Sequence, residues 1–121
     1  MKKYTETHEW IEIQDNIGTV GVTQYAQHEL GDVVYVELPK IGKTVEAGKE
    51  AAVLESTKAA ADVYSPVSGT IVEVNSRLGE SSELINQSPE NEGWIFKIQL
   101  KNPDEGKKLL SSEQYQNQIK G

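Results

Sequence analysis

Hydrophobic and polar residues alternate along several short segments of the chain, and this pattern is typical of half-buried β-strands. The first of these segments form a predicted hairpin over residues Glu9–Val22, with Asp15 and Asn16 in its turn. Three further strands are predicted for VVYVELP (33–39), VSGTIVEVN (67–75) and WIFKIQL (94–100). Short strands with frequent turns between them favour an all-β sandwich or barrel.

A few short helical segments are expected around these strands. Thr23 can cap a helix that Gly31 ends, and one helical turn is predicted around Leu84. Near the C-terminus, Asn102 is a favourable N-cap and Pro103 occupies the first helical position. The pattern therefore predicts a mainly β fold with short peripheral helices, including a C-terminal helical segment.

The stretch AAVLESTKAAADVYSPVSG, residues 51–69, fits two different structures. Ala, Leu, Glu and Lys are good helix formers, so propensity alone predicts a helix with Lys58 as a solvated side chain. Gly48 interrupts that pattern, and Pro66 disfavours a helical residue before it. The alternative is a hairpin of AAVLES and AADVYSP with Thr57 and Lys58 at its tip, although the tip lacks the Asn-Gly or Asp-Gly pair of a favoured tight turn. The residues alone leave both structures open.

The size and charge of the chain restrict its class. Its 121 residues fit a single domain over 1–121. The 19 acidic and 12 basic residues give a net charge of −7, which disfavours nucleic acid and membranes as partners and suits basic patches on other proteins. There is no apolar membrane span and no secretory signal, so we expect a cytoplasmic protein, acting as a monomer.

The chain lacks the sequence motifs of several common enzyme classes. It has no cysteine, so any sulfur redox chemistry must come from an attached group. Its two histidines, His8 and His28, are 20 positions apart and form no zinc-protease motif. No nucleophile elbow or phosphate-binding loop appears. We therefore predict a non-catalytic protein with no catalytic residue and no metal site.

The region from Val53 to Asn75 resembles the lipoyl-attachment segment of the H proteins of the glycine cleavage system. Their pattern is roughly Glu-Ser-x-Lys-Ala-x-x-Asp followed by Pro-x-Ser-Gly. The matching residues are Glu55, Ser56, Lys58, Ala59, Asp62, Pro66, Ser68 and Gly69. Four more segments look like family segments in family order: THEW (7–10), GVTQYAQHELGDVVYVELP (21–39), GKTVEAG (42–48) and GWIFKI (93–98). Because they cover nearly the whole chain, the resemblance is specific.

The resemblance implies both a fold and a function. The fold is a barrel-sandwich hybrid of two packed sheets, with lipoate bound covalently to Lys58 at an exposed hairpin tip. Lipoate ligase or octanoyltransferase would attach the acyl group to Lys58. The lipoyl arm would accept an aminomethyl group from pyridoxal-phosphate-dependent glycine decarboxylase and carry it to the tetrahydrofolate-dependent aminomethyltransferase. Flavin-dependent dihydrolipoyl dehydrogenase would then reoxidise the arm.

The resemblance also implies roles for residues around the lysine. Attachment enzymes are expected to recognise the residues Glu55, Ser56, Ala59 and Asp62. Thr7 and Glu9 are expected to line a cleft that shelters the loaded arm, and Gly69 is expected to provide a turn with positive φ. At Glu29 the chain differs from relatives that carry a histidine there.

Other functions would also fit part of this sequence evidence. An H-like protein that passes lipoate to other enzymes, or serves lipoate-dependent redox signalling, would have the same fold and the same Lys58. A lipoyl domain of a 2-oxoacid dehydrogenase fits less well, because those domains are shorter and carry Asp-Lys-Ala where this chain has Thr57–Lys58–Ala59. A biotin carrier would favour Met on both sides of the lysine. A pure interaction module, with an unmodified Lys58, remains the alternative of a different class.

Overall fold

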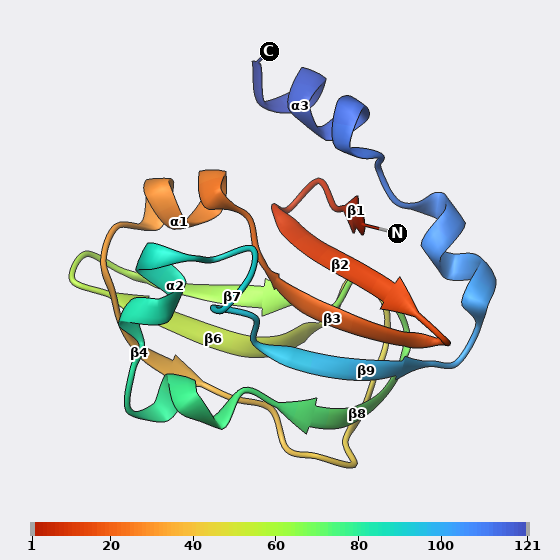
Figure 1. Ribbon diagram of the computed structural model, residues 1–121, viewed down its shortest axis with the longest axis horizontal. Coiled ribbons are helices and arrows are strands. Elements are labelled where there is room, and N and C mark those ends of the chain that lie inside the picture. Colours follow the sequence, from red (N-terminus) through yellow and green to blue (C-terminus); the bar gives the residue numbers. More distant parts are fainter. Residues whose placement is uncertain (1, 121) are drawn as a thin grey trace.

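The computed structural model describes residues 2–120 and consists of two antiparallel β-sheets with short helices around them (Figure 1). The six-stranded sheet has the order β1 (Lys2–Tyr4), β2 (Glu9–Gln14), β3 (Ile17–Val22), β9 (Phe96–Leu100), β8 (Gly69–Val74) and β5 (Thr44–Val45). The three-stranded sheet has the order β4 (Val33–Glu37), β6 (Glu50–Ser56) and β7 (Ala60–Tyr64). The predicted two-sheet sandwich is confirmed, although the sheets stay open and do not close into a barrel.

The helical segments lie at the periphery (Figure 1). They are α1 (Gln24–Leu30), η1 (Ser76–Gly79), α2 (Glu83–Gln87), η2 (Pro103–Lys108) and α3 (Ser112–Lys120), where η marks a 3-10 helix. Asn102 is the predicted cap and accepts a hydrogen bond from the Asp104 backbone at 3.0 Å. The segment that it starts is a 3-10 helix, however, and the C-terminal α-helix begins only at Ser112. Tyr115 holds this helix by stacking on Tyr4, with ring centroids 4.9 Å apart.

The main hydrophobic core lies between the two sheets. Inward-facing residues of both sheets belong to one buried cluster, among them Ile11, Val20, Phe96 and Ile98 of the larger sheet and Val36, Leu54 and Val63 of the smaller one. Burying one such side chain contributes roughly 1.5–3 kcal/mol. This burial is the physical basis of the alternating pattern in the sequence.

The stretch with two possible structures is a hairpin. β6 pairs with β7 in a register that sets Leu54 opposite Ala61 and Glu55 opposite Ala60. Leu54 and Val63 are each 1% exposed, because both point into the core. A helix in this position would give up that burial and the pairing of β6 with β4, so the helix that propensity favours is wrong here.

Gly69 has a different role from the predicted one. The glycines with positive φ are Gly31, Gly42 and Gly48, whereas Gly69 is the first residue of β8. A Cβ atom at Gly69 would lie 2.0 Å from the backbone oxygen of Gln99 in β9. The position therefore requires glycine because another backbone approaches closely, and not because of a turn conformation.

We expect Gly69→Ala to lower the free energy of unfolding by about 1–3 kcal/mol, because the backbone of β9 must move to admit the methyl group. Gly79→Ala is the matched control, since a Cβ atom at Gly79 meets nothing within 4 Å. Chemical denaturation of both variants measures the difference. A Gly69→Ala protein as stable as the parent would contradict the close approach.

Candidate functional site

Lys58 lies at the tip of the β6–β7 hairpin, and its side chain is exposed. The connection between the two strands projects from the edge of the sandwich (Figure 1). A backbone hydrogen bond of 2.8 Å from Ser56 N to Ala59 O closes the turn, and Thr57 N donates to Asp32 O at 3.2 Å. The tip is therefore held by its own backbone and by the segment that precedes β4.

Ser56 organises this turn. Its hydroxyl oxygen accepts hydrogen bonds from Lys58 N at 3.1 Å and from Ala59 N at 3.0 Å, and the hydroxyl donates to Ala59 O at 3.1 Å. A serine side chain that binds nearby backbone N–H groups stabilises a turn without an Asn-Gly pair. Ser56, which the resemblance suggests as a recognition residue, thus positions Lys58 from within the hairpin.

The end of α1 lies beside the tip. The Lys58 ammonium donates a 3.2 Å hydrogen bond to the backbone oxygen of Glu29 in the last turn of α1. A Cβ atom at Gly31 would lie 3.0 Å from Lys58 Cε, so the glycine after the helix leaves room for the lysine. A cation at the C-terminal end of a helix is favourable, because the carbonyl groups there carry partial negative charge.

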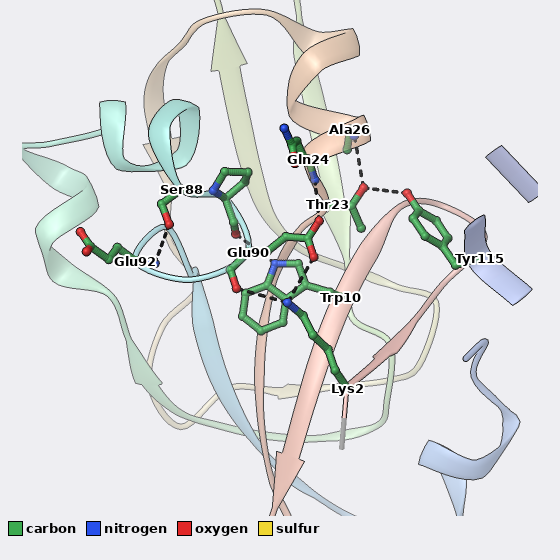
Figure 2. Close-up of polar contacts among 10 residues, drawn as sticks. Lys2, Trp10, Thr23, Gln24, Ala26, Ser88, Glu90, Glu92 and Tyr115 are labelled. Atoms are coloured by element: carbon green, nitrogen blue, oxygen red, sulfur yellow. Dashed lines mark hydrogen bonds and ion pairs between the residues drawn. The ribbon is translucent and has the colours of Figure 1, made fainter. Parts of the chain in front are cut away.

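The start of α1 is fixed from two sides, as Figure 2 shows. The Thr23 hydroxyl accepts a hydrogen bond from Ala26 N at 3.2 Å and is also hydrogen-bonded to the Tyr115 hydroxyl at 2.7 Å. The Glu90 carboxylate accepts a hydrogen bond from Gln24 N at 2.9 Å. The helix that contacts Lys58 is thereby attached to α3 and to the loop after α2.

Lys2 and Trp10 also contact the loop after α2 that holds the start of α1 (Figure 2). The Lys2 ammonium lies 3.2 Å from a Glu90 carboxylate oxygen and 4.6 Å from the centroid of the Trp10 ring. The Trp10 indole donates a hydrogen bond to Pro89 O at 3.0 Å, and its side chain is only 3% exposed. Trp10 is therefore a packing residue, and it joins β1 and β2 to the same loop.

Glu9 is buried at the start of β2, with 2% of its surface exposed. Its carboxylate accepts hydrogen bonds from Thr5 Oγ1 at 2.6 Å, Thr7 Oγ1 at 2.5 Å and Tyr64 N at 3.2 Å. Burial raises the pKa of Glu9, and these hydrogen bonds oppose that change. The structure thus keeps a carboxyl group in a position where its charge is costly, and such groups are often functional.

β7 connects the tip to Glu9. It runs from Ala60, next to the turn, to Tyr64, whose backbone N–H binds the Glu9 carboxylate. Four residue steps along a strand correspond to about 13 Å. The same strand thus joins the hairpin that carries Lys58 to the buried carboxyl group of Glu9.

His8 and Tyr25, which the sequence analysis did not select as site residues, contact each other close to Glu29 of α1. The His8 ring is 4.7 Å from the Tyr25 ring, and a hydrogen bond to Glu29 raises the pKa of Tyr25. Burial lowers the pKa of His8, and the charge of Glu29 partly offsets this. Tyr25 and Glu29 are four residues apart on one helix, and this spacing was the available signal that their side chains meet.

The other predicted residues of the hairpin are exposed. Glu55 and Asp62 lie on the two strands and Ala59 lies in the turn, so all three are close to Lys58 along the hairpin. Thr7 is exposed and lies beside Glu9, at the other end of β7. Gly69 belongs to the six-stranded sheet and is not part of this group.

Residues 2–120 contain neither a metal-binding cluster nor a helix that could span a membrane. No three His, Asp or Glu side chains within residues 2–120 are placed to hold a metal ion. None of the helices in that range is long and apolar enough to cross a membrane. What the structure offers to a prosthetic group is an exposed primary amine on a hydrogen-bonded turn, which suits covalent attachment.

Comparisons with known proteins agree with this geometry. The family model described as "Glycine cleavage H-protein" matches residues 2–121. The "Glycine cleavage system H protein" of Thermotoga maritima is 55% identical over 116 residues, covering 96% of this chain and 94% of that protein. A "Probable glycine cleavage system H protein 1" of Sulfolobus acidocaldarius is 54% identical over 114 residues, covering 94% and 83%. The crystal structure of a glycine cleavage system H protein from Mycobacterium marinum superposes with a TM-score of 0.91 at 36% identity and covers 99% of this chain and 97% of that one. The chain therefore belongs to the glycine cleavage H-protein family.

Proposed function

We propose that this chain is the lipoyl carrier of a glycine cleavage system, with lipoate bound to Lys58. The observation that carries the proposal is the exposed Lys58 on a turn that Ser56 holds, in a chain of the H-protein family. Neither a lipoate-relay role nor a 2-oxoacid dehydrogenase lipoyl domain is favoured by the relatives, which carry the glycine cleavage name.

Attachment converts the Lys58 amine into an amide. Nζ forms a bond to the carbonyl carbon of an activated lipoyl or octanoyl donor, and the bond from that carbon to its adenylate or thiol leaving group breaks. The ammonium loses one proton before the attack and one after it. Lys58 then no longer carries the charge that binds Glu29 O, so the modified side chain is free to leave the end of α1.

The chain itself acts as a non-catalytic carrier subunit. When attached, the lipoyl group supplies a disulfide that takes an aminomethyl group from pyridoxal-phosphate-dependent glycine decarboxylase, delivers it to the tetrahydrofolate-dependent aminomethyltransferase and is reoxidised by flavin-dependent dihydrolipoyl dehydrogenase. Lipoate ligase or octanoyltransferase carries out the attachment, and Glu55, Ser56, Ala59 and Asp62 present Lys58 to it. The exposure of Glu55 and Asp62 beside the tip supports this role.

Thr7 and Glu9 shelter the cargo on the loaded arm. The aminomethyl nitrogen is positively charged, and a buried carboxyl group with a raised pKa gains strongly from a cation beside it. β7 connects the Lys58 hairpin to Glu9, and this connection supports the role. His8, next to Glu9 in the chain, contacts the Tyr25 ring of α1 in a tilted geometry with the ring centroids 4.7 Å apart.

Exchanging Thr57 and Lys58, by Thr57→Lys together with Lys58→Thr, tests whether position or composition directs attachment. We expect at least a tenfold lower rate of lipoylation with normal folding, because the Ser56 hydroxyl fixes the backbone N–H of position 58 and not that of 57. Mass spectrometry after reaction with purified lipoate ligase, ATP and lipoate measures the rate. Thr57→Ala is the control and should react like the parent. Efficient modification of the exchanged protein would mean that local chemistry, not presentation, is recognised.

A further inference from the structure

The outward side of the three-stranded sheet has a composition of its own. The strand register aligns Tyr35 with Glu55, and Glu55 with Ala60, in one row. Directly opposed residues of neighbouring strands point to the same side, and positions two apart along a strand share a side. The outer face is defined here by these residues: Tyr35, Glu37, Val53, Glu55, Ala60 and Asp62.

The outer face combines an exposed aromatic ring with unpaired acids. Tyr35 is 55% exposed, and Val34, the extra residue of the bulge beside it, is 57% exposed. Glu37, Glu55 and Asp62 are exposed, and within residues 2–120 none of them forms an ion pair. The six residues include no Lys or Arg. Exposed tyrosines are enriched at the energetic centres of protein interfaces, and the acids complement a basic partner.

The outer face is continuous with the attachment site. β6 and β7 carry two of its acids, Glu55 and Asp62, and the same two strands end at the turn that presents Lys58. We infer that this face docks the enzyme that acylates Lys58, with Tyr35 in an apolar socket and with Glu37, Glu55 and Asp62 against a basic surface. The inference rests on the proposed function and extends the attachment site to β4, which the hairpin motif does not include.

The location of the chemistry favours the acylating enzyme as the partner over the three enzymes of the cycle. The three cycle enzymes react with the dithiolane, at the end of an arm roughly 14 Å from the Lys58 Cα atom. The acylating enzyme must bring its active site onto Nζ itself, so it must cover the surface around the tip. Its acyl donor carries phosphate groups, either in an adenylate or in a phosphopantetheine thioester. A site that binds phosphates is rich in Lys and Arg, which match the acidic outer face.

Steady-state lipoylation by purified lipoate ligase with ATP and lipoate tests the inference. We expect Tyr35→Thr, which keeps a β-branched residue in the strand, to raise the KM for the protein about tenfold with little change in kcat. The double change Glu37→Gln and Asp62→Asn should lower kcat/KM about fivefold at low salt. This second effect should shrink as salt rises, because it depends on long-range charge.

Ile41→Thr is the matched control for Tyr35→Thr, because it removes an exposed side chain, 63% exposed, from the loop after β4. The double change Glu12→Gln and Glu46→Gln is the control for the two acids, because it removes two exposed charges outside the outer face. The kinetics of both controls should equal those of the parent, and thermal unfolding checks that every variant is folded. A parent protein that the ligase does not modify would refute the proposed function. A modified parent with an unchanged KM in Tyr35→Thr would refute the docking face alone. Concentration-dependent dimers in sedimentation that Tyr35→Thr abolishes, together with an unchanged KM, would assign the face to a second copy instead.

Discussion

Replacing Lys58 by Arg is expected to abolish lipoylation completely and to leave the fold intact. The guanidinium of arginine stays protonated in proteins and offers no nucleophilic amine. The side chain at this position is exposed, and an arginine can still donate a hydrogen bond to the Glu29 backbone oxygen at the end of α1. The parent and the variant are to be compared by intact mass and peptide mapping, after expression in a lipoate-replete cell and after reaction with lipoate ligase in vitro.

Lys49→Arg is the matched control for this experiment. Lys49 is also exposed and precedes β6, at the end of the strand opposite to the tip. It lacks the turn that Ser56 organises, so its replacement should leave lipoylation unchanged. Lipoyl-dependent exchange of CO2 into glycine, catalysed by glycine decarboxylase, should be supported by the parent and by Lys49→Arg but not by Lys58→Arg. Lipoate found on another lysine of the Lys58→Arg protein would contradict the assignment of the site.

Glu9→Gln is expected to release formaldehyde from the aminomethyl-loaded protein about ten- to a hundredfold faster than the parent. The estimate corresponds to a charge-assisted contact of roughly 1.5–3 kcal/mol between the Glu9 carboxylate and the positively charged cargo. Lipoylation of the unloaded protein should stay unchanged, because the hairpin tip is not altered. Trapping the released formaldehyde over time, with purified loaded protein, measures the rate.

Glu12→Gln makes the same chemical change three residues further along β2, where the side chain is exposed, and it should release formaldehyde at the parent rate. The rate difference between Glu9→Gln and the parent should vanish as the pH falls through the raised pKa of Glu9, since the protonated side chain no longer attracts a cation. Equal rates for Glu9→Gln and the parent near neutral pH would remove Glu9 from the shelter.

The pKa of Glu9 has a further consequence for stability. Because burial raises this pKa above its unfolded value, the contribution of Glu9 to stability is complete below the unfolded pKa and is lost as the pH rises through the folded pKa. The unfolding free energy of Glu9→Gln should therefore increase relative to that of the parent as the pH rises above the unfolded pKa, about 4, and through the raised folded pKa of Glu9. Urea titrations at several pH values measure this difference.

Local signals in the sequence determined the elements that depend on neighbouring residues alone. Alternation located the β2–β3 hairpin, and its turn residues Asp15 and Asn16 have the positive φ values, 53° and 63°, that this turn requires. Thr23 and Gly31 bound α1, since a cap and a glycine act within a few residues of themselves. The prediction that Lys58 is the attachment residue came from the family resemblance and not from any local rule.

The tertiary structure decided what depends on partners distant in the sequence. Residues 51–64 form a hairpin because Leu54 and Val63 meet a core that other strands supply, and this burial outweighs helix propensity. Gly69 is required by the backbone of β9, and Glu9 is buried by Thr5 and by β7. Each of these facts rests on atoms brought together by sheet pairing, whose register and long-range contacts leave no periodic signal at the position concerned.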